Sequence, residues 1–142
     1  MIIAIGSDHA GFEAKSIIIE YLKSKNIEYK DFGTYSTESV DYPDIAHAVA
    51  KAVENKEFTI GILICGSGQG VNITANKYAK IRSALCWNTE IASLSRQHND
   101  ANILALPGRF LKKNELLDIV DIFLNTSFEG GRHLNRVNKI SC

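Results

Sequence analysis

Residues 58–76, FTIGILICGSGQGVNITAN, place a cysteine between a buried strand and a glycine-rich turn. Residues 58–64 form a nearly continuous apolar run rich in β-branched side chains, which is typical of a strand buried on both faces of a parallel sheet. Cys65 ends this strand. The next five residues, 66–70, contain three alternating glycines, so the backbone can turn tightly and direct several N–H groups towards one point before a helix begins near Val71. The stretch therefore predicts an anion site beside a thiol.

The glycine spacing does not indicate a nucleotide site. It reads G-x-G-x-G, whereas a dinucleotide fingerprint reads G-x-G-x-x-G and a Walker A loop carries a Lys-Ser/Thr pair after its last glycine. Cys65 has two interpretations: a small buried hydrophobe that closes a strand, or a thiolate stabilised by converging amides. Because the loop supplies those amides, we expect a chemical role for Cys65.

The composition excludes several classes of partner. The chain has 142 residues, of which 45% are apolar and 23% charged, as expected for one soluble domain spanning residues 1–142. Sixteen basic residues balance sixteen acidic ones, so the bulk charge predicts no nucleic-acid partner and no membrane partner. Any anion site must be local.

The sequence also predicts a cytoplasmic protein with reduced thiols. No apolar run approaches the roughly 18 residues that span a bilayer, and the N-terminal residues lack the charged region and apolar core of a signal peptide. Cys65, Cys86 and Cys142 are odd in number and scattered, without the spacing of metal ligands. We expect no metal site and no cofactor.

Apolar strand-like segments alternate with apolar-periodic helical segments along the whole chain. The strands are predicted at residues 1–5, 27–32, 58–65, 81–86 and 102–106, and the helices at 12–25, from 43, from 71, 89–97 and 114–124. Such alternation with short loops favours an α/β fold. We therefore predict a single-domain, doubly wound, five-stranded parallel sheet in a Rossmann-like three-layer αβα sandwich.

Two further loops carry polar side chains that suit a ligand site. Asp8 and His9 follow the first strand, although Asp8 could simply cap the next helix and His9 could be solvated. His98 and Asn99 belong to a polar cluster before the last strand, where a histidine could equally interact with a helix C-terminus. We expect the loops at Asp8, Cys65 and His98 to gather at the carboxyl edge of the sheet.

Tyr42 directly precedes Pro43, a residue that suits the first turn of a helix. It could line a pocket or pack at the helix entry. We favour the helix entry.

The C-terminal segment contains a possible phosphate site. Gly130 and Gly131 form a paired hinge, and Arg132 and Arg136 follow at positions i and i+4. If the segment is helical, both guanidinium groups share one face and could bind a phosphate through bidentate hydrogen bonds. The alternative is a solvated basic tail.

Six motifs together resemble the ribose-5-phosphate isomerase B family, which includes the galactose-6-phosphate isomerase subunits. They are GSDHAGF at 6–12, VDYPD at 40–44, GILICGSGQG at 61–70, ANK at 75–77, SRQHNDANIL at 95–104 and EGGRHLNRV at 129–137. Each motif is weak alone, but their order and spacing across nearly the whole chain are highly specific.

The resemblance implies roles for individual residues. Cys65 corresponds to the base that moves a proton between C1 and C2 of the sugar, His98 to the acid and base that opens the furanose ring, and Ser67 to a hydroxyl donor. Substrate contacts correspond to Asp8, His9, Gly66, Gly68, Gln69, Gly70, Asn99 and Arg109, and phosphate contacts donated by a neighbouring subunit to Arg132 and Arg136.

The resemblance further implies an aldose-ketose isomerase that interconverts ribose 5-phosphate and ribulose 5-phosphate through an enediolate. It implies a homodimer or a tetramer of this chain, with residues 129–142 contacting a neighbouring subunit. One alternative is an isomerase of a six-carbon substrate, allose 6-phosphate or galactose 6-phosphate. The other is a non-catalytic phosphosugar-binding module, which would keep the glycines and arginines without needing Cys65 or His98.

Overall fold

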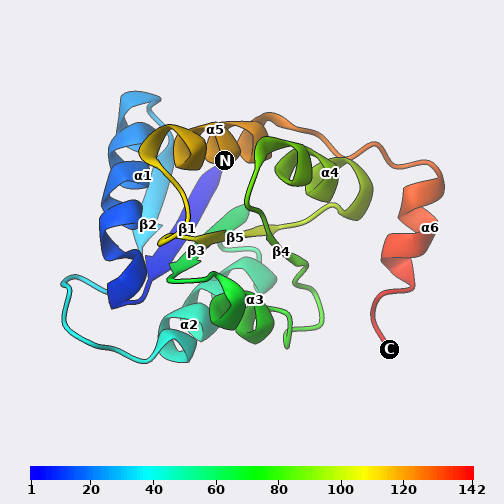
Figure 1. The fold of residues 1–142 in the computed structure, drawn as a ribbon. Helices are drawn as coiled ribbons and strands as arrows, with labels where there is room; N and C mark the ends of the chain where they lie inside the picture. The colour runs from blue at the N-terminus through cyan, green and yellow to red at the C-terminus, as the bar shows by residue number, and fades with distance from the viewer.

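The computed structural model describes residues 1–142 and contains one five-stranded parallel sheet with the strand order β2-β1-β3-β5-β4 (Figure 1). The strands are β1 (Ile2–Ser7), β2 (Glu28–Asp31), β3 (Ile60–Cys65), β4 (Ser83–Leu85) and β5 (Ile103–Pro107). All six residues of β3 are buried, as the apolar run predicted. The predicted parallel α/β sheet is confirmed.

Helices cover both faces of the sheet and give the predicted three layers. They are η1 (His9–Gly11), α1 (Phe12–Ser24), α2 (Tyr42–Glu54), α3 (Gln69–Ala75), α4 (Thr89–Asn99), α5 (Lys113–Asn125) and α6 (Arg132–Asn138). Buried residues of α1, α4 and α5 pack in one core cluster, and those of α2 and α3 pack in the other. Figure 1 shows the two groups of helices on opposite sides of the sheet.

The pleat of β3 divides its side chains between these two cores. Ile60, Ile62 and Ile64 belong to the core under α1, α4 and α5, whereas Leu63 and Cys65 belong to the core under α2 and α3. Since successive side chains of a strand alternate between faces, the position of Cys65 follows from the register of the whole strand.

The order of the strands creates a crevice between β1 and β3. The chain passes from β1 to β2 on one side and then returns across β1 to β3 on the other, so the winding direction reverses there. In open α/β sheets ligands bind at the carboxyl ends of strands next to such a reversal. Ser7 pairs with Ile64 and Cys65 pairs with Pro107, so the ends of β1, β3 and β5 meet at this edge.

Helix α6 lies beside α4, away from the β1 and β3 strands (Figure 1). The backbone N–H of Glu129 donates to the carbonyl of Gln97 at 3.1 Å, which ties the segment before α6 to the last turn of α4. None of the helices has the length and apolar character that crossing a membrane requires.

Candidate functional site

The loop after β3 presents three unpaired main-chain donors. The N–H groups of Gly66, Ser67 and Gly68 donate no hydrogen bond within the protein. Gly68 has a φ of 74°, and a Cβ atom there would lie 2.5 Å from Leu85 Cδ1 and 3.0 Å from the carbonyl oxygen of Leu106. Only glycine fits this turn without displacing its neighbours. The loop therefore offers three free main-chain donors in a row, as an anion site needs.

Cys65 lies directly beside this loop at the end of β3. It is 5% exposed. Its carbonyl accepts a hydrogen bond from Gly108 N at 2.9 Å, and the carbonyl of Gly66 accepts one from Arg109 N at 3.1 Å, so the turns after β3 and β5 are fixed to each other. The hydroxyl oxygen of Ser67 accepts from Gln69 N at 3.3 Å, which leaves its O–H group free to donate to a ligand.

Arg109 supplies positive charge at the same edge. Its side chain lies against Gly66, where a Cβ atom would be 3.3 Å from Arg109 Nη1. The guanidinium pairs with no carboxylate and makes no side-chain hydrogen bond, so its donors remain available.

Asp8 and His9 reach this edge from the end of β1, as the sequence predicted. Asp8 is 7% exposed, and its Oδ1 accepts from Gly11 N at 3.1 Å, while Oδ2 makes no hydrogen bond in the protein. Asp8 therefore caps η1 and still offers an oxygen to a sugar hydroxyl. Nδ1 of His9 accepts from Val40 N at 3.2 Å, which assigns the proton of the neutral ring to Nε2 as a free donor.

Tyr42 lies at the entry of α2, as the sequence predicted, and close to the loop after β3. It is the first residue of α2, but its ring packs so closely on Gly70 that a Cβ atom there would lie 2.4 Å from two ring carbons. Glycine at position 70 therefore allows the contact. The ring is 39% exposed beside the donor loop, a proximity that sequence separation alone does not reveal.

The structure contradicts the prediction that His98 lies at the carboxyl edge. Helix α4 extends to Asn99 instead of ending near Gln97, so His98 and Asn99 form its last turn. Because α4 runs back across the sheet before β5 begins, this turn lies at the amino edge. Between Ile103 and Pro107, the partner of Cys65, β5 rises by roughly 13 Å. His98 and Cys65 of one subunit are therefore at opposite edges.

The residues assigned to the site therefore fall into two sets, and His98 and Asn99 lie with the arginines of α6 and not with Cys65. We call them the thiol half-site (Asp8, His9, Cys65, residues 66–70 and Arg109) and the arginine half-site (His98, Asn99, Arg132 and Arg136).

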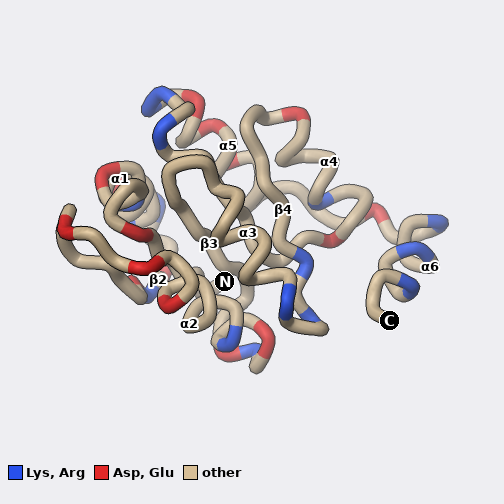
Figure 2. Tube along the Cα trace, turned by 60° about the horizontal axis from the view of Figure 1, so that its bottom comes forward, with Lys and Arg blue, Asp and Glu red and all other residues tan.

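The arginines of the second half-site lie on a helix, as their spacing required. Arg132 and Arg136 are exposed on α6 and pair with no carboxylate. Figure 2 shows the basic residues of α6 at the end of the molecule. His133, between them, is buried instead and faces α4. The two guanidinium groups are therefore free to bind an anion.

His133 is the residue that the sequence analysis left without a role. Its ring stacks on that of His98 with 4.2 Å between centroids and 11° between planes, and its Nε2 lies 3.5 Å from Glu129 Oε2. Burial lowers the pKa of His133, the positive charges of His98, Arg132 and Arg136 lower it further, and Glu129 opposes them. In the sequence, only the position of His133 between two arginines that point outward indicated that its side chain points inward.

His98, Glu129 and His133 also place nitrogen and oxygen atoms within 4.8 Å of one another, a separation that could suit a metal ion. The two imidazole rings are nearly parallel, however, so their lone pairs lie in two separate, almost parallel planes. Metal ligands must direct their lone pairs to one point. The cluster is arranged for stacking.

The other cysteines have different surroundings from Cys65. Cys86 is fully buried, and burial raises the pKa of its thiol to about 11. It is therefore the core residue that the sequence predicted, with little thiolate at neutral pH. Cys142 is exposed at the C-terminus.

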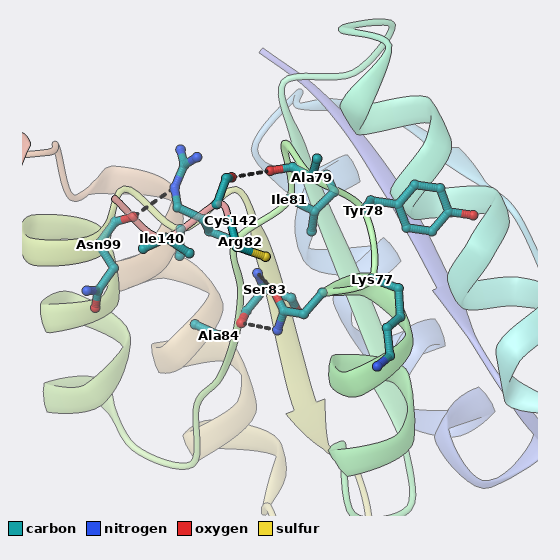
Figure 3. A pocket seen from close by; sticks show the side chains of 13 residues that line it. Lys77, Tyr78, Ala79, Ile81, Arg82, Ser83, Ala84, Asn99, Ile140 and Cys142 are labelled. Carbon is teal, nitrogen blue, oxygen red and sulfur yellow. Dashed lines mark hydrogen bonds between the residues drawn. The ribbon is translucent and has the colours of Figure 1, made fainter. Parts of the chain in front are cut away.

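A pocket of about 520 Å³ lies at the amino edge, between residues 76–84 and the C-terminal residues 140–142 (Figure 3). Arg82 donates from Nε to the carbonyl of Asn99 at 2.9 Å, which fixes the end of α4 beside this pocket. Cys65 does not line it. Cys65 and residues 66–70 line none of the four pockets of the chain, so one subunit alone forms no pocket around the thiol half-site.

The sequence of this chain is similar to those of known proteins. Residues 3–140 match the family model Ribose/Galactose Isomerase. Ribose-5-phosphate isomerase B of Escherichia coli (strain K12) is 47% identical over 98% of this chain and 93% of its own length. A putative sugar phosphate isomerase of Rickettsia bellii (strain RML369-C) is 50% identical over 97% of this chain and 96% of its own length.

Solved structures are equally similar. Ribose-5-phosphate isomerase B of Clostridium thermocellum superposes with a TM-score of 0.97 at 52% identity, covering 99% of this chain and 95% of that one. Ribose-5-phosphate isomerase B of Mycoplasma genitalium with bound ribulose-5-phosphate has a TM-score of 0.94 at 45% identity, covering 98% and 93%.

Proposed function

The chain belongs to the ribose/galactose isomerase family, and we propose that it interconverts ribose 5-phosphate and ribulose 5-phosphate through an enediolate. The observation that carries the proposal is the row of three unpaired N–H groups at residues 66–68 beside Cys65. Aldose-ketose isomerisation needs a base at a weakly acidic carbon and donors for the oxygen charge that develops next to it. The thiol half-site offers both within one turn of chain.

In the proposed reaction the thiolate of Cys65 removes the proton from C2 of the open aldose. The C–H electron pair forms the C1=C2 double bond, and the carbonyl electrons move to O1, where the main-chain donors stabilise the charge. The proton then returns to C1, the hydroxyl at C2 gives its proton to O1, and the C2 oxygen becomes the ketone. Removing one such donor typically costs about 3 to 4 kcal/mol of transition-state stabilisation.

We propose further that each complete site combines the thiol half-site of one subunit with the arginine half-site of another. A furanose ring must open before C2 can lose its proton, and the ring oxygen and C2 are both bonded to C1. The groups that act on them must therefore approach within a few ångström of each other. The location of Cys65 and His98 at opposite edges of one subunit supports a site that two subunits share.

The thiol half-site forms no pocket within a single subunit, and this observation supports the assembly. A site that binds a small ligand usually encloses most of the ligand's surface. A neighbouring subunit would close the open loop with His98 and Asn99 and would bring the free guanidinium groups of Arg132 and Arg136 to the phosphate. Two-fold symmetry would then generate two equivalent sites.

The first experiment compares substrates. The purified protein, assayed with ribose 5-phosphate, allose 6-phosphate and galactose 6-phosphate at equal concentrations, is expected to show its highest kcat/KM with ribose 5-phosphate. A higher kcat/KM with either hexose phosphate would reassign the substrate, and no turnover of any of the three would leave only a binding function.

A second experiment separates ring opening from proton transfer. His98→Asn is expected to lower kcat for ribose 5-phosphate by about 10²-fold, because general acid and base catalysis contributes at least that much. Glyceraldehyde 3-phosphate cannot form a furanose, so any turnover that the wild type shows with it should be nearly unaffected. Equal losses with both substrates would mean that His98 does not act on the ring.

A further inference from the structure

The imidazole of His98 stacks on another ring and makes no hydrogen bond. Neither of its ring nitrogens makes a hydrogen bond to another protein group, and its face lies on the face of His133 at 4.2 Å. His98 is partly exposed at the end of α4, whereas His133 is 8% exposed. The buried ring is thus the surface on which the exposed ring rests.

The buried ring is itself well anchored. The backbone N–H of His133 donates to the carbonyl of Gly130 at 3.0 Å in the first turn of α6, and its Nε2 lies 3.5 Å from the Glu129 carboxylate. Glu129 N in turn donates to the carbonyl of Gln97, the residue next to His98. A main-chain hydrogen bond therefore connects the start of the α6 segment, which carries His133, to the residue next to His98.

The charges around His133 keep it neutral at neutral pH. Burial lowers its pKa first, the positive charges of His98, Arg132 and Arg136 lower it further, and Glu129 alone raises it. The ordinary pKa of histidine is near 6.5. Because the pKa of His133 is lower, its ring is neutral at neutral pH and is protonated only when the pH falls through the lowered pKa. A neutral ring can stack on His98 in either of its charge states, whereas two imidazolium rings would repel each other.

We propose that His133 is a positioning residue for ring opening, because its buried ring fixes the plane of the His98 imidazole and leaves both His98 nitrogens free for the sugar. The inference rests on the proposed function, in which His98 acts on the furanose ring. It predicts that the flat face of residue 133, and not its nitrogen atoms, is what the reaction needs.

The test compares His133→Ala, which removes the face, with His133→Phe, which keeps it. His47→Ala is the control, because His47 is exposed on α2 and also contacts one aromatic residue, Tyr78. With ribose 5-phosphate, His133→Ala should lower kcat on the order of 10-fold with KM within about 2-fold, since misplacing a catalytic group is costly. His133→Phe and His47→Ala should stay within about 2-fold of the wild type.

Three results would overturn the proposal: equal loss in the Ala and Phe variants, no loss in the Ala variant, or equal loss in the Ala variant with ribose 5-phosphate and with an acyclic aldose phosphate. Circular dichroism and native mass measurements must show that each variant folds and assembles as the wild type does. If the Ala variant does not fold, the Phe variant still tests the proposal, because a 10-fold loss of kcat in His133→Phe also contradicts it.

A second measurement does not depend on the substrate. In a carbon-labelled sample, the Cε1–H signal of His98 should carry the ring-current shift of a stacked neighbour, keep it in His133→Phe and lose it in His133→Ala. In the wild type the shift should also fade as the pH drops through the lowered pKa of His133. If the shift behaves so but no sugar phosphate is isomerised, the proposed function fails while the stacked pair stands; if the shift is absent from the wild type, the inference fails.

Discussion

The Cys65→Ala variant is expected to lose at least 10²-fold in turnover of ribose 5-phosphate while KM changes little. The magnitude is the lower end of what a general base contributes. Arg109 and the main-chain donors remain in the variant, so the substrate should still bind. The measurement is kcat and KM in a coupled assay of ribulose 5-phosphate formation.

Stability is the control for this variant. Cys65 contributes to the core under α2 and α3, so its truncation should cost about 1 kcal/mol of unfolding free energy, far less than needed to unfold the chain. Cys65→Ser, which keeps nearly the same shape, should be as inactive as Cys65→Ala, because a protonated hydroxyl is a much weaker base than a thiolate. Full activity in either variant would exclude the thiol as the base.

Alkylation offers an independent check on the same thiol. Cys142 is exposed and would also react, so the experiment needs a Cys142→Ser background, whereas the buried Cys86 with its raised pKa should stay unmodified. In that background, iodoacetamide should inactivate the protein as one equivalent is incorporated at Cys65, and saturating substrate should slow both. Inactivation without modification of Cys65 would contradict the assignment.

The sequence predicted the sheet and the thiol half-site because both depend on local patterns. The apolar run of β3 determined its burial, and parallel strands bring their carboxyl ends together, so Asp8 and Cys65 had to meet. The error in placing His98 has a simple cause. Residues 98–100 connect a helix to the strand that follows it, and such a connection lies at the amino edge of a parallel sheet, whether the helix ends at Gln97 or at Asn99.

The contacts of Tyr42 and His133 could not be predicted, because both join elements that are distant in sequence. The Tyr42 ring reaches Gly70 across α2 and α3, and the His133 ring reaches His98 across α4 and α6. Such pairs depend on how helices pack, and neither residue interrupts the apolar periodicity that locates a helix. The arginines on α6 were accessible to sequence reasoning, since a spacing of four residues specifies one helical face without reference to any partner.

Mixing two inactive variants is expected to restore about a quarter of the wild-type activity. The pair is Cys65→Ala, which damages the thiol half-site, and Arg132→Ala/Arg136→Ala, which damages the arginine half-site. Charge-assisted hydrogen bonds to phosphate contribute about 1.5 to 3 kcal/mol each, so the arginine variant alone should raise KM at least 10-fold. After subunit exchange of equal amounts, half of the dimers are mixed, and one of the two sites in each mixed dimer is intact, which gives the quarter.

The matched control mixes two variants that damage the same half-site, His98→Asn and Arg132→Ala/Arg136→Ala. Each site of that mixed dimer contains one damaged arginine half-site, so no activity should return. Activity should therefore return in the first mixture and not in the second, because Cys65 lies at one edge of the subunit and His98 and α6 lie at the other. If native mass measurements show mixed dimers in the first mixture and activity still fails to rise, both half-sites serve a single subunit, and α4 and α6 must then move across the sheet to reach Cys65.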